Sequence, residues 1–238
     1  TEIFTEPFPL PRTPQWENYV RAWTIGKMGV YFKNSIILTA ATLFVSAIIG
    51  SMASYILAKY TFKGKSFVYI LFLAGMMIPI QTVIIPLAFT FGKLGIVDNL
   101  PVLVLLYSAF CLSMTVFIVT GYMKGLPDEL EEAAVMDGAG HGIVFFRIIL
   151  PLSMPAIASA SIFNFVSAWN NLLFPLVFIS KDSMKTISIG LLSFFGAYTS
   201  DYGAVMAAIG VSIIPPIIMY ILLQEKMEKG LTAGAVKG

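Results

Sequence analysis

Charged side chains are scarce in this sequence of 238 residues, because Asp, Glu, Lys and Arg together make up only 12% of it. A soluble globular domain has about 25% of such residues, so this shortage excludes an ordinary soluble protein. Hydrophobic residues make up 58% of the chain. Five long stretches contain no Asp, Glu, Lys, Arg or His at all: about 34–58, 67–91, 102–122, 153–179 and 204–223.

A membrane-spanning helix needs about 20 mostly apolar residues, because that length crosses a hydrocarbon core of about 30 Å. The chain is therefore predicted to be an all-α integral membrane protein, a polytopic bundle with five spans within 34–238. Residues 1–33 are predicted to form an extracytoplasmic segment that leads into the membrane. Several prolines remove backbone donors within the spans, which favours either a packed bundle around a cavity or ordinary kinks: Pro79, Pro86, Pro175 and Pro215-Pro216.

Cysteine and histidine each occur once, as Cys111 and His141. A lone thiol forms no internal disulfide, and one cysteine with one histidine cannot complete a zinc site or a catalytic triad. The sequence has no block of five Lys or Arg, and its formal net charge is only +2, which excludes the basic stripe expected of a nucleic-acid-binding protein. We predict no metal site, no catalytic residue and no nucleic-acid partner.

A nucleotide site is also excluded. Gly64-Lys65-Ser66 resembles the end of a phosphate-binding loop, but Lys59 stands where the first glycine of that loop would be. We therefore predict that the chain is not an enzyme and holds no cofactor. The spans lack the carboxylates, histidines and lysines by which most ion-coupled carriers work, although a carrier with sodium sites made of carbonyl and hydroxyl oxygens stays an alternative.

Lysine and arginine placement predicts the orientation in the membrane. Five spans put the two chain ends on opposite sides. One set of loops carries eight basic residues and the other seven, if those of 1–33 are counted. The first set, which includes the C-terminal segment, is predicted to be cytoplasmic.

The loop at about 126–151 is far more polar than the spans beside it. Pro127 followed by acidic residues begins a helix favourably, because proline fits the first turn and carboxylates stabilise the positive end of the helix dipole. Leu130, Ala133, Ala134 and Asp137 then share one face. Gly138 and Gly140 are expected to end this helix, and a second one is predicted over 141–149. A helix this short is marginal in water, so we expect it to dock on its own bundle or on another protein.

The same loop carries a known motif. Glu132-Ala133-Ala134, then Gly138, Ile148 and Leu150-Pro151, reproduces at every fixed position the EAA motif of ABC-importer permeases. The segments ENYVRAW, FKNS, FKGK, AVMDGAG, SAWNNLLFPL and GLTAGAVKG also resemble the MalG-type permeases of bacterial carbohydrate importers. The resemblance implies the type I ABC-importer permease fold, in which a further span precedes the point where this sequence starts.

Partners and site residues follow from the resemblance. It implies a second homologous permease, two ATPase subunits that bind ATP and Mg²⁺, an extracellular solute-binding protein and a location in the bacterial plasma membrane. The EAA loop would be the coupling helix that sits in a cleft of the ATPase, through Glu132, Ala133, Ala134, Asp137, Gly138, Gly140, Leu150 and Pro151. The C-terminal residues Gly230, Gly234 and Lys237 would add an ATPase contact.

The predicted function is a permease that forms half of the pathway for a sugar or oligosaccharide. An importer permease for amino acids or peptides, or an ion-coupled carrier, is the alternative. Neutral amides beside an indole suit a polyhydroxylated solute, but such residues also hold helices together. The pathway candidates are Asn164, Ser167, Trp169, Asn170 and Asn171, with Gln81 as a weaker one. The loop 180–202, with Tyr198, Asp201 and Tyr202, is either a contact for the solute-binding protein or an ordinary polar loop.

Overall fold

The computed structural model describes residues 13–197 and 201–235, and this part of the chain contains helices and no strand. Helices suit a membrane protein because lipid offers no hydrogen-bond partners, so the backbone must satisfy its own groups. The all-helical class predicted from the composition is confirmed. The order is α2 (Glu17–Thr24), α3 (Met28–Lys59), α4 (Lys65–Met77), α5 (Ile80–Leu94), α6 (Leu100–Met123), α7 (Glu129–Met136), α8 (His141–Val144), a π-helix (Phe145–Ile149), α9 (Leu150–Leu152), α10 (Met154–Trp169), α11 (Leu173–Phe178), a 3₁₀ turn (Asp182–Met184), α12 (Ile187–Ala197) and α13 (Tyr202–Ala235).

Within the described residues, three helical segments are long and apolar enough to cross a membrane: Met28–Lys59, Leu100–Met123 and Tyr202–Gln224. Two further helix pairs reach that length only together, across sharp bends. The pair α4 and α5 bends by 96°, and His141–Leu152 bends by 70° against α10. The structure therefore holds up to five spans, if each bent pair counts as one.

The bent pairs differ from the spans expected at 67–91 and 153–179. The first is divided at Pro79, which cannot donate a backbone hydrogen bond. The expected span at 153–179 is also divided: α10 ends at Trp169, and Leu173–Phe178 form the separate helix α11. The helix expected over 141–149 passes through a π-helical turn and continues to Leu152, because Pro151 occupies the first turn of α9, where no backbone donor is needed. By contrast, α13 runs unbroken through Pro215-Pro216.

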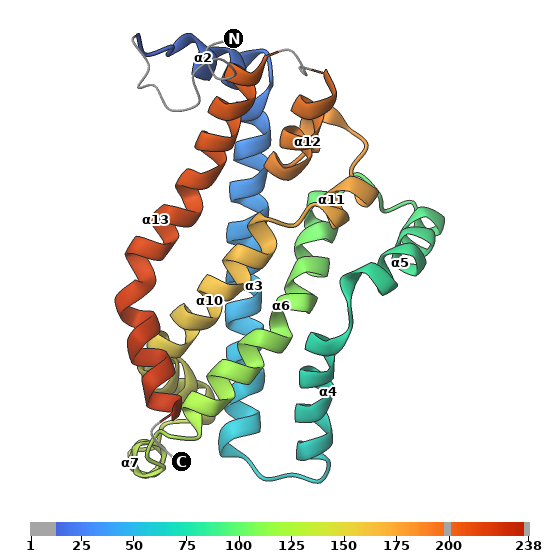
Figure 1. Ribbon diagram of the computed structural model, residues 1–238. Helices are drawn as coiled ribbons and strands as arrows, with labels where there is room; N and C mark the ends of the chain where they lie inside the picture. The colour runs from blue at the N-terminus through green and yellow to red at the C-terminus, as the bar shows by residue number, and fades with distance from the viewer. Residues whose placement is uncertain (1–12, 198–200, 236–238) are drawn as a thin grey trace.

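The helix α3 lies at the centre of the bundle (Figure 1). It packs most extensively against α6, while α10 and α13 lie on one side of this pair and α4 on the other. Among the shorter helices, α7 lies at one end of the bundle and α2 and α12 lie toward the other. We refer to these as the α7 end and the α2 end.

Small residues bring α3 and α6 close together. Ser46, Gly50, Ser51 and Ser54 are all buried along α3. Such residues let helix backbones approach in a membrane, where close packing rather than the hydrophobic effect joins helices. A Cβ added to Gly50 would lie 2.5 Å from Cγ2 of Thr115 on α6, so there is no room for a larger side chain.

We predict that Gly50→Val lowers the thermal unfolding midpoint of the detergent-solubilised protein, because overpacking a tight interface costs about 1–3 kcal/mol. Gly121→Ala on α6 is the control, since a Cβ there meets nothing within 4 Å. An unchanged midpoint for Gly50→Val would show that the two helices are not tightly packed at this point.

Candidate functional site

The acidic helix α7 has a well-defined end. Glu129, Glu131 and Glu132 lie in its first turn, where carboxylates suit the helix dipole. At its other end Gly138 has φ +83°, a left-handed conformation that glycine adopts without strain. The backbone N–H of Gly138 donates to Val135 O and that of Ala139 donates to Ala134 O, both at 2.9 Å. These two bonds form a Schellman motif, which satisfies the last carbonyls of the helix.

Polar contacts fasten α7 to the end of α3. Lys59 Nζ donates to the carbonyl of Leu126 and lies 2.6 Å from Asp128 Oδ1. The Lys59 side chain is only 5% exposed, so its charge is held between α3 and the loop. The hydrogen bond from Lys59 lowers the pKa of Asp128 below its ordinary value. The hydroxyl of Tyr55 donates to Glu131 Oε2 at 2.9 Å.

A third contact joins the loop after α7 to the same place. The Tyr60 hydroxyl lies 2.9 Å from His141 Nδ1, and their rings meet edge to face. The Tyr60 hydroxyl oxygen also lies 3.3 Å from the Tyr55 hydroxyl oxygen. These contacts are continuous, and they hold the residues before and after α7 against the end of α3.

The two faces of α7 differ in their surroundings. Ala134 and Ala139 pack on the apolar cluster that contains Val144, Phe145 and Ile149. Leu150 packs on the same cluster, whereas Gly140 and Pro151 are exposed. The opposite face is exposed and mixed in character, with Glu132, Ala133, Val135, Met136 and Asp137. The face expected to be shared by Ala133 and Ala134 is therefore divided, because only Ala133 is open to a partner.

Position 138 requires glycine for its left-handed backbone conformation rather than for its small size, since a Cβ there would meet nothing within 4 Å. We predict that Gly138→Ala loosens α7, because an alanine with positive φ costs about 1–2 kcal/mol. Gly138→Asn should be tolerated better although Asn is larger, because Asn adopts this conformation more readily. Amide hydrogen exchange of 130–139 measures the effect. Faster exchange in the Asn variant than in the Ala variant would contradict the account, and Gly142→Ala is the control.

The predicted pathway residues fall into two groups. Asn164 and Trp169 are buried in contacts between helices: Asn164 Nδ2 donates to Thr115 Oγ1 at 2.9 Å, and Trp169 Nε1 donates to the carbonyl of Ser212 at 3.1 Å. Trp169 also stacks on Phe165. These contacts fit the alternative reading, in which polar residues hold the bundle together.

Ser167 and Asn171 instead line a cavity of about 270 Å³ beside the junctions of α4 with α5 and of α10 with α11. Asn171 Oδ1 accepts a hydrogen bond from the backbone N–H of Phe174 at 3.1 Å, at the start of α11. Asn170 is exposed at the end of α10, and Gln81 is exposed in the first turn of α5; neither lines this cavity.

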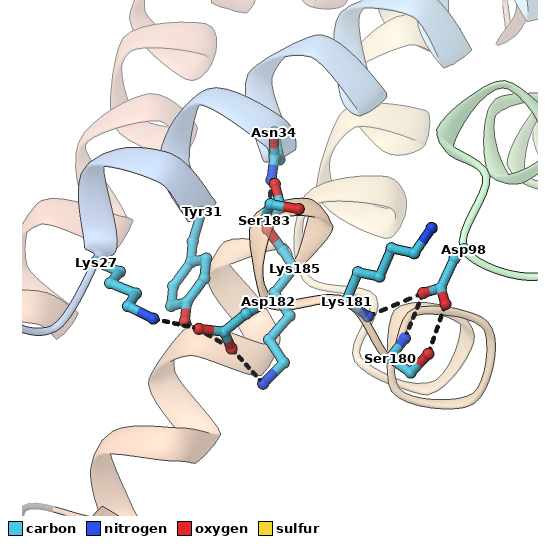
Figure 2. Close-up of polar contacts among 9 residues, drawn as sticks. All are labelled: Lys27, Tyr31, Asn34, Asp98, Ser180, Lys181, Asp182, Ser183 and Lys185. Carbon is cyan, nitrogen blue, oxygen red and sulfur yellow. Dashed lines mark hydrogen bonds and ion pairs between the residues drawn. The ribbon is translucent and has the colours of Figure 1, made fainter.

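At the α2 end, the segment 180–187 is held by three groups of contacts (Figure 2). Asp98 accepts from the backbone N–H groups of Ser180 and Lys181, at 2.6 and 2.9 Å, and from the Ser180 hydroxyl. Asn34 on α3 donates to the carbonyls of Ser183 and Lys185, both at 2.9 Å. These bonds fix an exposed, charged turn against α3 and against the connection between α5 and α6.

Asp182 completes this turn, with Lys185 at 2.7 Å and Lys27 on its other side. Hydrogen bonds from Lys185 and then from Lys27 lower the pKa of Asp182 from 3.8 to about 2. A carboxyl with a lowered pKa contributes stability above its ordinary pKa and loses it only as the pH falls toward the lowered value. Its contribution is therefore constant above about pH 5.

We predict that Asp182→Asn speeds amide hydrogen exchange of 180–187 by up to about fivefold, because an exposed ion pair contributes about 0.2–1 kcal/mol. Lowering the pH from 7.5 to 5.5 should not reproduce this change once intrinsic exchange rates are corrected for. Ser183→Ala is the control, since Ser183 takes part through its backbone carbonyl. Loosening of the wild-type turn at pH 5.5 would contradict the ion-pair account.

Comparison with known proteins identifies the family. Residues 46–233 match the family described as "Binding-protein-dependent transport system inner membrane component". The chain belongs to this family. It is 34% identical over 99% of its length to the diacetylchitobiose uptake system permease protein NgcG of Streptomyces coelicolor, and covers 79% of that protein. It is also 37% identical over 93% of its length to the trehalose/maltose transport system permease protein MalG of Thermococcus litoralis, and covers 81% of it.

A solved structure shares the fold of this permease. It is a bacterial ABC transporter involved in the import of the acidic polysaccharide alginate, which matches 91% of the chain and 81% of the solved chain with a TM-score of 0.76 and 24% identity. The resemblance to MalG-type permeases and the permease fold predicted from the sequence are confirmed. The chain is an inner-membrane permease of an ABC transport system.

Sequence reasoning missed several residues of this permease that the structure brings to the candidate sites. Tyr55, Lys59 and Tyr60 hold the loop around α7, yet nothing in the sequence pairs them with that loop. Tyr107 lines the cavity beside Ser167 and Asn171. The signal that could have found Tyr107 is a hydroxyl in the middle of a span, since buried polar groups usually need a partner.

The predicted C-terminal contact is only partly described. Gly230 and Gly234 fall within α13, whereas Lys237 lies outside the described residues, as does Tyr198 of the loop 180–202. The prediction that these C-terminal residues contact a partner stays a prediction.

Proposed function

We propose that this permease forms half of the translocation pathway for a sugar or oligosaccharide in an ATP-driven importer. A second homologous permease supplies the other half. Two separate ATPase subunits bind ATP and Mg²⁺ and supply the energy. The observation that carries the proposal is α7, an acidic helix that is held firmly on one face by its own bundle and left open on the other.

The open face of α7 suits a partner surface. Met136 is 86% exposed and Val135 48%, which is costly for apolar side chains unless something covers them. Both side chains, together with Glu132, line a cleft of about 440 Å³ whose other walls include Lys59, Tyr60 and His141. In this proposal the ATPase contacts the exposed residues Glu132, Ala133, Asp137 and Gly138. A displacement of α7 is then transmitted to the bundle through Ala134, Leu150 and Pro151.

The substrate class rests on the relatives and on the chemistry of the spans. The similar proteins from Streptomyces coelicolor and Thermococcus litoralis are permeases for diacetylchitobiose and for trehalose and maltose. An arabinooligosaccharide transport system permease from Halalkalibacterium halodurans is 34% identical over 96% of the chain. Neutral solutes agree with the five long apolar stretches of the sequence, whose only ionisable side chains are tyrosines and one cysteine.

The two ends of the bundle have different partners in this proposal. The α7 end and the C-terminal segment, with Gly230, Gly234 and Lys237, face the cytoplasm and the ATPase. The α2 end faces outward, where the turn at 180–187 offers an ordered, charged surface to a solute-binding protein. Docking of the loaded binding protein and closure of the ATPases on ATP then switch the pathway from inward-facing to outward-facing, and hydrolysis returns it.

We predict that Ala133→Trp lowers sugar uptake about tenfold or more, because a clash of about 1.4 kcal/mol or more at the partner surface reduces docking by that factor. Ala133 is exposed in this chain, so membrane insertion and the unfolding midpoint should not change. The assay is uptake of labelled sugars against labelled amino acids in a strain deleted for the permease, with co-purification of the ATPase.

The control is Lys63→Trp, an equally bulky change at an exposed position of the turn between α3 and α4. Normal uptake and normal ATPase co-purification by Ala133→Trp would overturn the coupling role of α7. Uptake of amino acids rather than sugars by the wild type would overturn the substrate class alone.

A further inference from the structure

The cavity of about 270 Å³ lies where the break between α4 and α5 and the break between α10 and α11 meet α6. Its walls are formed by Gly75, Met76 and Ile78 at the end of α4, Ile80 of α5, Tyr107, Phe110 and Cys111 of α6, and Ser167, Asn171 and Phe174 around the break between α10 and α11. No charged side chain lines it. Its position in the bundle makes it the meeting point of elements that are far apart in the sequence.

Two helix ends leave backbone carbonyls without donors at this cavity. In a continuous helix the N–H of residue i donates to the carbonyl of residue i−4, and proline has no N–H. Gly75 lies in the last turn of α4, where carbonyls have no intrahelical donor, and Asn171 precedes α11 at a point where Pro175 has no N–H to offer its carbonyl. Both of these residues line the cavity. Within residues 13–197 and 201–235, no hydrogen bond to either carbonyl is found.

Side chains add further hydrogen-bonding groups to the same walls. Tyr107 is 3% exposed, and its buried hydroxyl has no partner among the described residues. Asn171 uses its Oδ1 for the backbone of Phe174, which leaves its amide N–H groups to donate. Ser167 adds a second hydroxyl to the lining. A buried hydroxyl without a partner, such as that of Tyr107, is costly, and the half-buried Asn171 and exposed Ser167 lie beside it on the same walls, so the lining suits a polar ligand.

The arrangement fits a neutral hydroxylated ring. The backbone carbonyls of Gly75 and Asn171 can accept hydrogen bonds, and the Asn171 amide can donate them. The hydroxyls of Tyr107 and Ser167 can do both. Sugar hydroxyls also both donate and accept, and the faces of Tyr107, Phe110 and Phe174 can cover the C–H surface of a ring. Ligand pockets in proteins start at about 300 Å³, so this volume suits one sugar ring rather than a longer chain. An ionised amino acid finds no counter-charge here.

We propose that this cavity is a binding site for one uncharged sugar unit, in which Tyr107, Asn171 and Ser167 contact the hydroxyl groups. The proposal rests on the proposed carbohydrate transport, and it assigns a substrate contact to this subunit itself. The ligand then supplies hydrogen-bond partners for the Tyr107 hydroxyl and for the unpaired carbonyls of the lining. Broken helices in other transporters likewise expose backbone groups to the substrate near the middle of the membrane.

The test uses the complete transporter, reconstituted with its second permease, ATPase and binding protein. Tyr107→Phe removes only the unpartnered hydroxyl, and Asn171→Asp keeps the acceptor for Phe174 while removing the amide donors. Each variant should weaken binding of labelled glucose, arabinose or N-acetylglucosamine, whichever the wild type binds, about fivefold, the factor expected for one lost hydrogen bond. Tyr122→Phe on the same helix is the control.

A second readout uses Cys111, which is the only cysteine in this chain and lines the cavity. Bound sugar should slow its alkylation by N-ethylmaleimide, followed by mass spectrometry, and Tyr107→Phe should reduce this protection. Wild-type binding and protection in both variants would overturn the site while leaving carbohydrate transport intact. A lower unfolding midpoint for Tyr107→Phe would give the hydroxyl a structural role and also overturn it. A wild-type transporter that imports no sugar would instead refute the proposed function.

Discussion

A backbone carbonyl inside a membrane has no water to bind, and this constraint decides where the helices of this permease can break. Each break needs surroundings that replace the lost hydrogen bonds. The break at Pro79 and the one between α10 and α11 lie at the walls of one cavity, and a third break, at Ser153, bends His141–Leu152 by 70° against α10. Pro215-Pro216 in α13 produces no such break. The position of a proline in the sequence thus does not decide its effect; the neighbouring helices do.

The helix α3 connects the two ends of the molecule. It spans 32 residues, or about 48 Å at 1.5 Å per residue. Tyr55 and Lys59 hold α7 at one end, and Asn34 together with Ser35 holds the segment 180–187 at the other, where Ser35 Oγ accepts from the backbone N–H of Ile187 at 2.8 Å. A displacement of α7 is therefore passed to a single rigid element that also touches the opposite surface.

Much of this organisation could be predicted from the sequence, for physical reasons. Long runs without charge have few uses outside a membrane, so the helical class followed from composition. The acidic start and glycine end of α7 are local signals, and the structure places that helix within two residues of the sequence-based position. The EAA motif identified the family because its spacing covers a whole loop rather than one turn.

Other features depended on contacts that a sequence does not contain. Asn164 and Trp169 looked like pathway residues, yet they pack against α6 and α13, because a neutral polar side chain in a span serves packing and transport equally well. Tyr107 looked like an ordinary aromatic residue, since nothing in the sequence tells that its hydroxyl lacks a partner. The sequence allowed a kink at several prolines but not the choice among them, because Pro86 and Pro79 have the same local chemistry and only Pro79 breaks the helix.

The central claim is that the open face of α7 is covered by a nucleotide-hydrolysing partner. The most direct measurement places a photo-crosslinking amino acid at Met136, the most exposed apolar position of α7, and irradiates native membranes that contain the whole transporter. The account predicts a crosslink to the ATPase subunit that changes in yield when ATP hydrolysis is blocked. Crosslinks only to lipid or within this chain, in every nucleotide state, would contradict it.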